Sequence, residues 1–424
     1  MISISTSYAE ETSISSWVEQ ITLWYKQHKI SESEFHNAFD FLIEKEIIKS
    51  NSSKSTKELI YGISDKEKNW NIVRSTLDGA TKEVITSFNL TSLEGVRPLH
   101  AIDLKLSPDG KFFLYVFSKD SKSLWIVDTE TKVKQLVVKA EDNQRLSQYF
   151  WSPDSKKISY SLEDIPPPCD NCGMPAYFIS GTYYFYDIEN QKTQIIREPT
   201  RGIGLGGWWD NEHLVFSEFE WHYVKIPFHL YNINSKESIF LTEVDYFPSL
   251  VINQNNNHMI VLNPSITNKC EILIINTEAK KESRIQLDDP CPTNYNQDFS
   301  LSQDGFNLIY GKVQAPFGGE ITTAVADKNG VYVIPSIYSL NLKTKIEHPI
   351  LLGKPNEKYI MFGSWNEESD ALAYLDWHIE PEEERFSMMI SKSDASKAIE
   401  IAKIERGRQE HWQEITFYGW KSSQ

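Results

Sequence analysis

The sequence predicts a mainly β protein, namely a seven-bladed β-propeller preceded by a short N-terminal α-helical hairpin. Three observations support this prediction. A turn tetrapeptide followed by an apolar run recurs along most of the chain, a strand-like segment stands alone at the C-terminus, and an amphipathic stretch precedes a polar linker. The aromatic residues (12 Trp, 20 Tyr and 21 Phe) also suit strands, because flat side chains pack well on a pleated surface.

Residues 1–50 predict the helical hairpin. Apolar side chains recur at helical spacing over residues 14–28 and again over residues 31–48. Ser31 is a suitable N-cap for the second helix, and Glu34 completes a capping box with it. We therefore expect two amphipathic helices joined by a short turn.

A polar, Ser-rich segment at residues 51–57 predicts a linker, after which residues 58–424 form the propeller. A hairpin of this size cannot bury two apolar stripes by itself, so another surface must cover it. It either folds back onto the propeller or mediates docking or oligomerisation through residues 14–48.

The repeat predicts blades of four strands each. Every unit begins with a tight turn of Pro, Asp, Asn, Ser or Gly between two apolar runs, and a second pair of strands follows around another polar turn. The first turns of the units lie at 107–110, 151–155, 208–211, 253–256, 302–305 and 365–368. A unit of roughly 45–60 residues is the period of a propeller blade.

The remaining blade is split between the two ends of the repeat region. Residues 59–88 contain only three strand patterns, and residues 413–420 contain a first strand with nothing after it. Pairing the two segments would close the ring and remove two unpaired sheet edges. Rings of six or eight blades are the structural alternatives.

The repeat resembles the TolB-type (PD40, WD40-like) blade and is similar to the propeller of prolyl-oligopeptidase-like proteins. The resemblance rests on Ser-Pro-Asp-Gly at 107–110 and Trp-Ser-Pro-Asp-Ser at 151–155, and the motif is eroded in the other units. It covers residues 58–420. The Gly-x-Ser-x-Gly motif of the hydrolase domain found in the peptidase relatives is absent from the sequence.

The N-terminal stretch YKQHKISESEFHNAFDFLIEKEIIKS resembles helical hairpins of the SHOCT type. It is also similar to hairpins appended to proteins of ammonia-oxidising archaea. The resemblance covers about forty residues and implies docking or oligomerisation.

Composition restricts the classes of partner. The net charge of −16 would repel a polyanion, so we expect no nucleic acid. No run of about 18 apolar residues and no secretory signal occur, so we expect no membrane insertion and a cytoplasmic location.

Long connections between the second and third strands predict the binding face. These connections all meet one face of a propeller, whereas the turns on the other face are short throughout this sequence. The long connections are expected at 164–182, 219–227, 314–331 and 376–385.

Cys169 and Cys172 form a Cys-x-x-Cys pair that could bind zinc, because two thiolates at this spacing reach one tetrahedral ion. We expect His222, from the neighbouring blade, as a third ligand, although Cys270 or Cys291 could also contribute. A disulfide, a redox pair or two free thiols that fix a loop are the alternatives.

Two Trp-His pairs end equivalent second strands and predict a ligand-binding rim. They are Trp221-His222 and Trp377-His378, and packing Trp with polar His is the structural alternative. Gly204 and Gly206 lie in a glycine-rich junction that could bind a small ligand, or could instead fit a crowded place near the central channel. The acidic residues at 380–384 are expected to be a solvated rim rather than a catalytic pair.

The sequence contains no defensible catalytic motif, so we expect a non-enzymatic scaffold that binds a protein or peptide through the long-loop face. The alternative is a propeller with a metal or small ligand at the channel mouth, with an enzymatic role left open.

Overall fold

We analysed a computed structural model of the chain. The structure describes residues 58–91, 102–117, 121–165, 180–201, 203–218, 225–245, 249–253, 258–264, 270–276, 281–287, 299–302, 305–314, 334–353, 358–366, 370–379, 383–393, 395–407 and 414–421, together with Leu23, Trp24, Gln27 and Lys29. Residues 57–422 form one compact unit, and residues 1–56 with 423–424 form another.

The described strands form seven antiparallel four-stranded sheets. The first three sheets, from the inner to the outer strand, are β28 (Ile415–Lys421), β1 (Glu58–Ser64), β2 (Asn69–Thr76) and β3 (Lys82–Asn89); β4 (Ile102–Leu106), β5 (Phe112–Phe117), β6 (Ser123–Asp128) and β7 (Lys134–Lys139); and β8 (Gln144–Trp151), β9 (Lys157–Asp164), β10 (Ser180–Asp187) and β11 (Lys192–Arg201). The next two are β12 (Ile203–Trp208), β13 (His213–Glu218), β14 (Lys225–Asn232) and β15 (Ser238–Asp245); and β16 (Ser249–Asn253), β17 (His258–Pro264), β18 (Cys270–Asn276) and β19 (Lys281–Leu287). The last two are β20 (Phe299–Leu301), β21 (Asn307–Gln314), β22 (Ile334–Asn341) and β23 (Ile346–Leu351); and β24 (Lys358–Trp365), β25 (Ala371–Ile379), β26 (Glu383–Lys392) and β27 (Ile399–Gly407).

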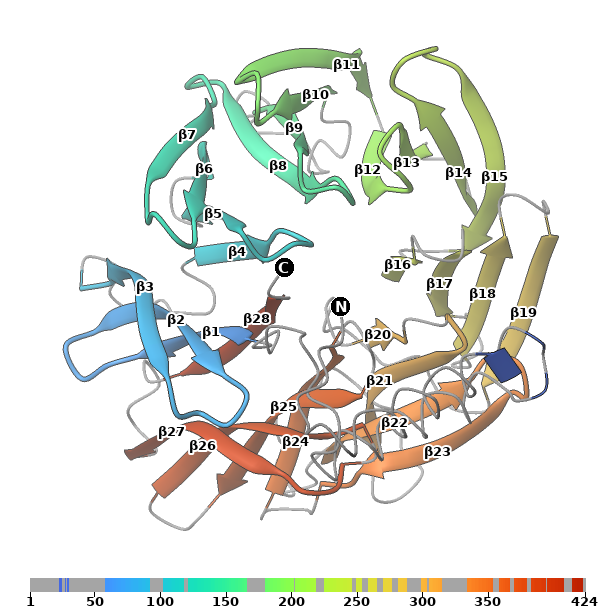
Figure 1. Ribbon diagram of the computed structural model, residues 1–424. Coiled ribbons are helices and arrows are strands. Elements are labelled where there is room, and N and C mark those ends of the chain that lie inside the picture. The colour runs from blue at the N-terminus through green and yellow to red at the C-terminus, as the bar shows by residue number, and fades with distance from the viewer. Residues whose placement is uncertain are drawn as a thin grey trace, which may run out of the picture. The chain divides into compact units, whose positions relative to one another are not determined.

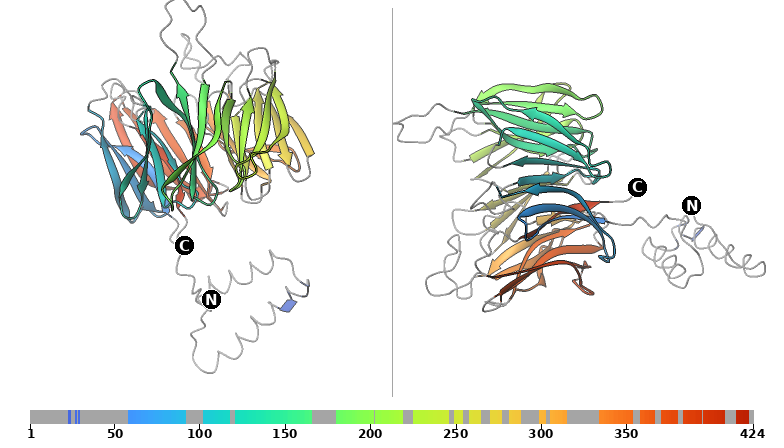
Figure 2. Two further views of the ribbon diagram at one scale, coloured as in Figure 1. Left: turned by 90° about the horizontal axis from the view of Figure 1, so that it is seen from above. Right: turned by 90° about the vertical axis from the view of Figure 1, so that its left-hand side faces the viewer.

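The sheets of the 57–422 unit stand side by side around a centre, as in a β-propeller, with β4, β8, β12, β16, β20, β24 and β28 innermost (Figure 1). Seen from the side, the strands of neighbouring sheets run across the ring from one face to the other (Figure 2). One sheet joins both ends of the unit, because β28 pairs with β1 from Ile415 opposite Ile63 to Lys421 opposite Glu58. This pairing gives β1 a partner on the side that would otherwise be an unpaired edge.

The repeated polar turns have one hydrogen-bond pattern between the first and second strands. A side-chain oxygen of the first turn residue accepts the backbone N–H five residues later, which closes the turn. The accepting residues are Ser107, Ser152, Ser302 and Asn366, at 2.8–3.0 Å.

The turns between the third and fourth strands follow a second pattern. A side-chain oxygen of Asp128, Asp187, Asn232 or Asn341 accepts the N–H three residues later, at 2.7–2.9 Å. The residue after that donor has a positive φ of 50–63° at Lys132, Gln191, Lys236 and Lys345. The recurring Asp/Asn of the sequence repeat is therefore the residue that organises this turn.

Neighbouring sheets are joined by two kinds of hydrogen bond. The Trp151 indole donates to the Lys105 carbonyl at 2.9 Å, and the Trp208 indole donates to the Phe150 carbonyl at 3.3 Å. At the same end of these two strands, in the turns that follow β4 and β8, the Asp109 N–H donates to Ser155 Oγ at 3.1 Å. In the segment Trp-Ser-Pro-Asp-Ser at 151–155, the first and last residues therefore both bond to the preceding sheet.

The core consists of clusters between adjacent sheets, and the outer strands contribute to it through β-bulges. In six of the seven outer pairings the register shifts so that one apolar residue of the outer strand is skipped. The skipped residues, Ile85, Val137, Ile196, Leu241, Ile350 and Ile401, all pack in or against the core clusters. The bulge turns these side chains inward on the outermost strand.

The fold-class prediction needs one correction, because no helix element occurs among the described residues. The hairpin expected over residues 14–48, and with it the SHOCT resemblance, lies almost entirely outside them. Trp24, from its apolar stripe, is 39% exposed, and the adjacent Leu23 is 45% exposed. Helices of this length are stabilised in proteins mainly by packing of their apolar face, and a sequence pattern does not show which surface would cover it. No described helix is long and apolar enough to cross a membrane.

Candidate functional site

The loop-bearing face is the face at which the inner strands begin and the second strands end. It contains Asp103 near the start of β4 and Asp164, Glu218 and Gln314 at the ends of β9, β13 and β21. The sequence segments 166–179, 219–224 and 315–333 leave from this face and lie outside the described residues. Segments 166–179 and 315–333 set this face apart from the opposite one, where the connections are turns of four to six residues. The segment expected at 219–227 is not long, because β14 already begins at Lys225.

Another of the expected long connections is wrong. The strands β25 and β26 remain paired up to Ile379 opposite Glu384, so the segment 376–385 is mostly strand. Glu384 accepts two hydrogen bonds from the buried Arg406 guanidinium, at 3.0 and 2.9 Å. This carboxylate is therefore a structural ion-pair partner and not part of a solvated acidic rim.

A polar cluster of Lys358, Asp376 and His378 lies at the loop-bearing end of β24 and β25. The Lys358 ammonium is 2.6 Å from Asp376 Oδ2, and His378 Nε2 is 3.0 Å from Asp376 Oδ1. The Asp376 carboxylate is buried, with 6% of the residue exposed. A buried carboxylate is stable only with such compensation, so Asp376 holds both basic side chains in place.

The adjacent Trp377 belongs to the opposite side of the same sheet, because successive side chains of a strand alternate. Its ring stacks on Phe386 with centroids 5.1 Å apart, and the Arg406 guanidinium lies 4.4 Å from the Phe386 centroid on that side. Trp377 is thus a packing residue. His378, expected to share a rim with it, is 31% exposed on the other side.

A second polar group lies between the inner strands β4 and β8. The Tyr149 hydroxyl donates to the exposed Asp103 carboxylate. The Lys105 ammonium donates to the Tyr149 carbonyl at 3.0 Å and lies 4.4 and 4.5 Å from the Tyr149 and Phe150 ring centroids. Burial lowers the pKa of Lys105, which the nearby Asp103 partly opposes.

Tyrosine hydroxyls near this group are held neutral. Burial, followed by the Asp103 charge, raises the pKa of Tyr149. Burial also raises the pKa of Tyr418, whose oxygen accepts a 3.0 Å hydrogen bond from the Trp70 indole. At neutral pH both tyrosines therefore act as hydrogen-bonding groups and not as anions.

The glycine-rich junction is an inner strand. Gly204 and Gly206 lie in β12, and the Leu205 N–H between them donates to Gln148 Oε1 at 2.6 Å. A Cβ on Gly204 would lie 2.7 Å from Ser217 Oγ. Close packing explains Gly204, and the one amide that Gln148 occupies is not available for a ligand.

The proposed zinc ligands Cys169, Cys172 and His222, together with Trp221, lie outside the described residues. Within the part of the chain that the structure describes, no group of three or more His, Cys, Asp or Glu side chains could hold a metal ion. The zinc site therefore stays a prediction.

Sequence reasoning missed the charged residues that the structure brings together. Asp376 interrupts an otherwise apolar strand pattern, ALAYLDWHI, and Asp103 and Lys105 alternate within the inner strand IDLKL. For Asp376 the available signal was a charge within an apolar strand pattern, whereas Asp103 and Lys105 occupy the polar positions of an alternating strand and gave no such signal.

No protein-family model matches this sequence. No curated protein matches it either. Solved structures do match, among them the acylaminoacyl peptidase of Pyrococcus horikoshii (13% identity, TM-score 0.52, covering 82% of this chain and 51% of that one) and an oligogalacturonate lyase of Vibrio parahaemolyticus (13% identity, TM-score 0.51, 76% and 91%). TolB of Acinetobacter baumannii also matches, with 11% identity and a TM-score of 0.44 over 72% of this chain and 65% of that one.

The similarities to the peptidase and the lyase show the β-propeller fold alone. The chain spans about half the length of the peptidase it matches. At identities of 11–13%, neither the peptidase nor the lyase activity carries over to this chain.

Proposed function

We propose that this protein is a scaffold whose loop-bearing face binds a protein or peptide partner. The observation that carries the proposal is the position of the two long connections, after Asp164 and after Gln314, on one face of the ring. Long connections on a rigid framework are where binding residues usually lie, since the framework itself need not change.

Two further features favour binding over catalysis. Among the described residues, the ionisable side chains at the loop-bearing ends are largely engaged with one another, as Asp376 is with Lys358 and Glu384 is with Arg406. The net charge of −16 favours a partner with a basic segment, because the field of the protein attracts it.

A small ligand at the channel mouth is the second candidate, and one observation favours it. Lys105 is a half-buried residue whose ammonium lies beside two aromatic rings and the exposed residue Asp103. Charge next to aromatic surface is typical of sites for small polar molecules. A Lys105→Met variant would lose binding of such a ligand, whereas peptide binding through the loops would persist.

Selection from a random peptide library tests the proposal. The bait is the full chain, and counter-selection uses a variant in which residues 166–179 and 315–333 are replaced by short Gly-Ser linkers. A matched control, Glu189→Ala/Glu237→Ala, changes exposed turn residues on the opposite face. We expect peptides enriched in Lys and Arg that bind the parent and the control but not the linker variant. Peptides that bind all three equally, or no enrichment, would refute the proposal.

A further inference from the structure

Three basic residues form a row across the sheet of β24, β25 and β26. Lys358 lies directly opposite His378, which in turn lies directly opposite Arg385. Directly opposed residues of antiparallel strands have Cβ atoms about 4.5–5.5 Å apart. The positive charges of Lys358 and Arg385 in this basic row (Lys358, His378 and Arg385) need compensation, because like charges on one sheet face destabilise it.

Asp376 compensates only part of the row. Its two carboxylate oxygens lie 2.6 Å from the Lys358 ammonium and 3.0 Å from His378 Nε2. Because Nε2 faces the carboxylate, Nδ1 is the ring nitrogen left for another partner.

The third member, Arg385, has no ion pair with a carboxylate among the described residues. Glu405 lies opposite it on β27, but this carboxylate pairs with Lys403 at 3.0 Å. The Arg385 Nε atom is buried and donates no hydrogen bond. A buried N–H donor without an acceptor destabilises the folded protein, because it has lost its hydrogen bond to water and gained none in return.

Asp376 Oδ1 is a second buried atom of this cluster that accepts no well-directed hydrogen bond, although His378 Nε2 is close to it. Buried polar atoms are almost always satisfied, and two exceptions on adjoining positions of one sheet face indicate an incomplete site. Asp376 pairs with Lys358, so the Arg385 guanidinium is the positive charge left without a carboxylate among the described residues, and a negatively charged acceptor would satisfy it.

We propose that the basic row binds an oxyanion, namely the carboxylate or phosphate group of a small molecule. Arg385 offers a planar fork of donors that matches either group, and Lys358 adds a point charge. The Lys358 and His378 side chains are 29% and 31% exposed, so a solute can reach them. Asp376 acts as a positioning residue that fixes both side chains. This site does not depend on peptide binding by the loops.

Isothermal titration of the full chain with sodium phosphate and, separately, sodium acetate tests the proposal, with ionic strength held constant by sodium chloride. Arg385→Gln removes the charge without removing the partner of another described residue, and Arg385→Lys keeps the charge but not the fork. Arg145→Gln is the matched control, since it removes an exposed arginine that pairs with Glu163 on another sheet.

We expect the wild type and Arg145→Gln to bind at least one of the two anions, and Arg385→Gln to bind it about tenfold more weakly or worse, with Arg385→Lys between them. The anion that binds more tightly identifies the ligand as a phosphate or a carboxylate. If neither anion bound the wild type above the chloride control, or if Arg385→Gln bound like the wild type, the proposal would be overturned. The wild-type titration decides this even if a variant does not fold.

Discussion

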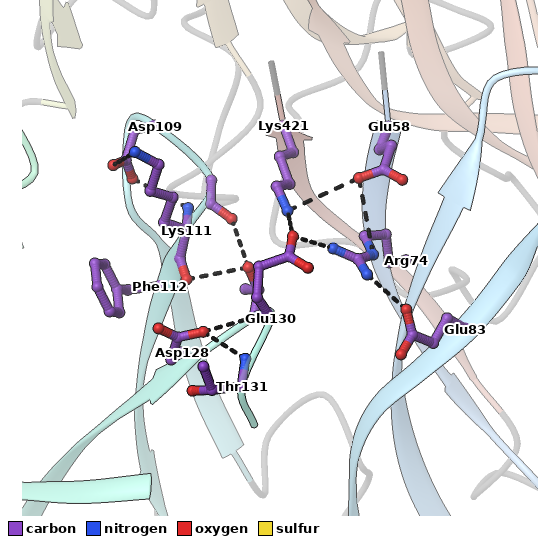
Figure 3. A network of polar contacts seen from close by, with 12 residues as sticks. Glu58, Arg74, Glu83, Asp109, Lys111, Phe112, Asp128, Glu130, Thr131 and Lys421 are labelled. Carbon is purple, nitrogen blue, oxygen red and sulfur yellow. Dashed lines mark hydrogen bonds and ion pairs between the residues drawn. The ribbon is translucent and has the colours of Figure 1, made fainter. Parts of the chain in front are cut away.

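The Lys421 ammonium on the last strand lies 3.9 Å from a carboxylate oxygen of Glu58 on the first strand, so an ion pair joins the two ends of the propeller beside the backbone pairing of β28 with β1. Both side chains belong to a larger network (Figure 3). Arg74 lies between Glu58 at 3.7 Å and Glu83 at 2.6 Å. Arg74 and Lys421 both contact Glu130 in a turn of the neighbouring sheet. The network therefore ties the closing sheet to the next one.

Removal of Arg74 should weaken this closure. Its side chain is only 14% exposed and compensates three carboxylates. We expect Arg74→Met to lower the free energy of unfolding by about 1–2 kcal/mol, less than for a fully buried pair because Glu83 and Glu130 are partly exposed. Urea denaturation measures this loss. Arg145→Met, which breaks an exposed pair, should cost no more than about 0.5 kcal/mol, and an equal loss in both variants would contradict the assignment.

The same network predicts how stability depends on acid. Hydrogen bonds from Lys132 and Arg74 lower the pKa of Glu83 to about 2, and hydrogen bonds from Lys421 and Arg74 lower the pKa of Glu130. Since both folded-state pKa values lie below the unfolded value near 4.5, this stabilisation is complete above about pH 4.5 and is lost as the pH falls towards 2. Thermal melts between pH 2 and 7 should show a shallower acid loss for Arg74→Met than for the wild type. Parallel curves would show that the network does not contribute.

Indole hydrogen bonds between sheets can be tested with a matched pair of variants. Trp151→Phe removes the hydrogen bond to the Lys105 carbonyl and should destabilise the protein by about 1–2 kcal/mol beyond the lost contact area. Trp365, also buried, has an indole N–H without a hydrogen-bond partner among the described residues. Trp365→Phe should therefore cost less than Trp151→Phe in chemical denaturation, and the reverse order would refute this interpretation.

Two glycines differ sharply in the room around them. A Cβ on Gly62 would lie 2.3 Å from the Trp70 ring and 2.8 Å from the Tyr418 ring, whereas the nearest atom to a Cβ on Gly181 is 3.4 Å away. Gly62→Ala should displace Trp70 from its hydrogen bond with Tyr418 and cost about 2–3 kcal/mol. Gly181→Ala should change the melting temperature little. An equal loss of stability in the two variants would contradict the crowding inferred around Gly62.

Much of this architecture could be predicted from the sequence because it is local. The turn residues at 107–110 and 151–155 and the Asp or Asn of the second turns encode hydrogen bonds within a few residues, and these form as expected. The pairing of β28 with β1 also follows the expectation for residues 413–420, since an incomplete blade needs one more strand. The N-terminal hairpin could not be predicted with the same support, because the sequence pattern does not identify the surface that would cover its apolar faces.

The candidate site was harder to predict because it depends on contacts between strands. Of the residues expected to line it, His378 lies in a polar cluster and is itself 31% exposed, while Trp377 packs against Phe386 and Gly204 fits beside Ser217. Asp376 and Arg385 were not identified, since their role depends on which residue lies opposite them on the next strand. Strand register is a property of the folded sheet and cannot be read from a single strand.

Hydrogen exchange of the full chain with and without a selected peptide tests the central claim most directly. If the loop-bearing face receives the partner, protection should appear near Asp103, Asp164 and His378, while the opposite turns at 107–110 and 128–133 exchange as in the free protein. Protection confined to those opposite turns, or to the outer strands, would contradict the account and place the binding surface elsewhere on the propeller.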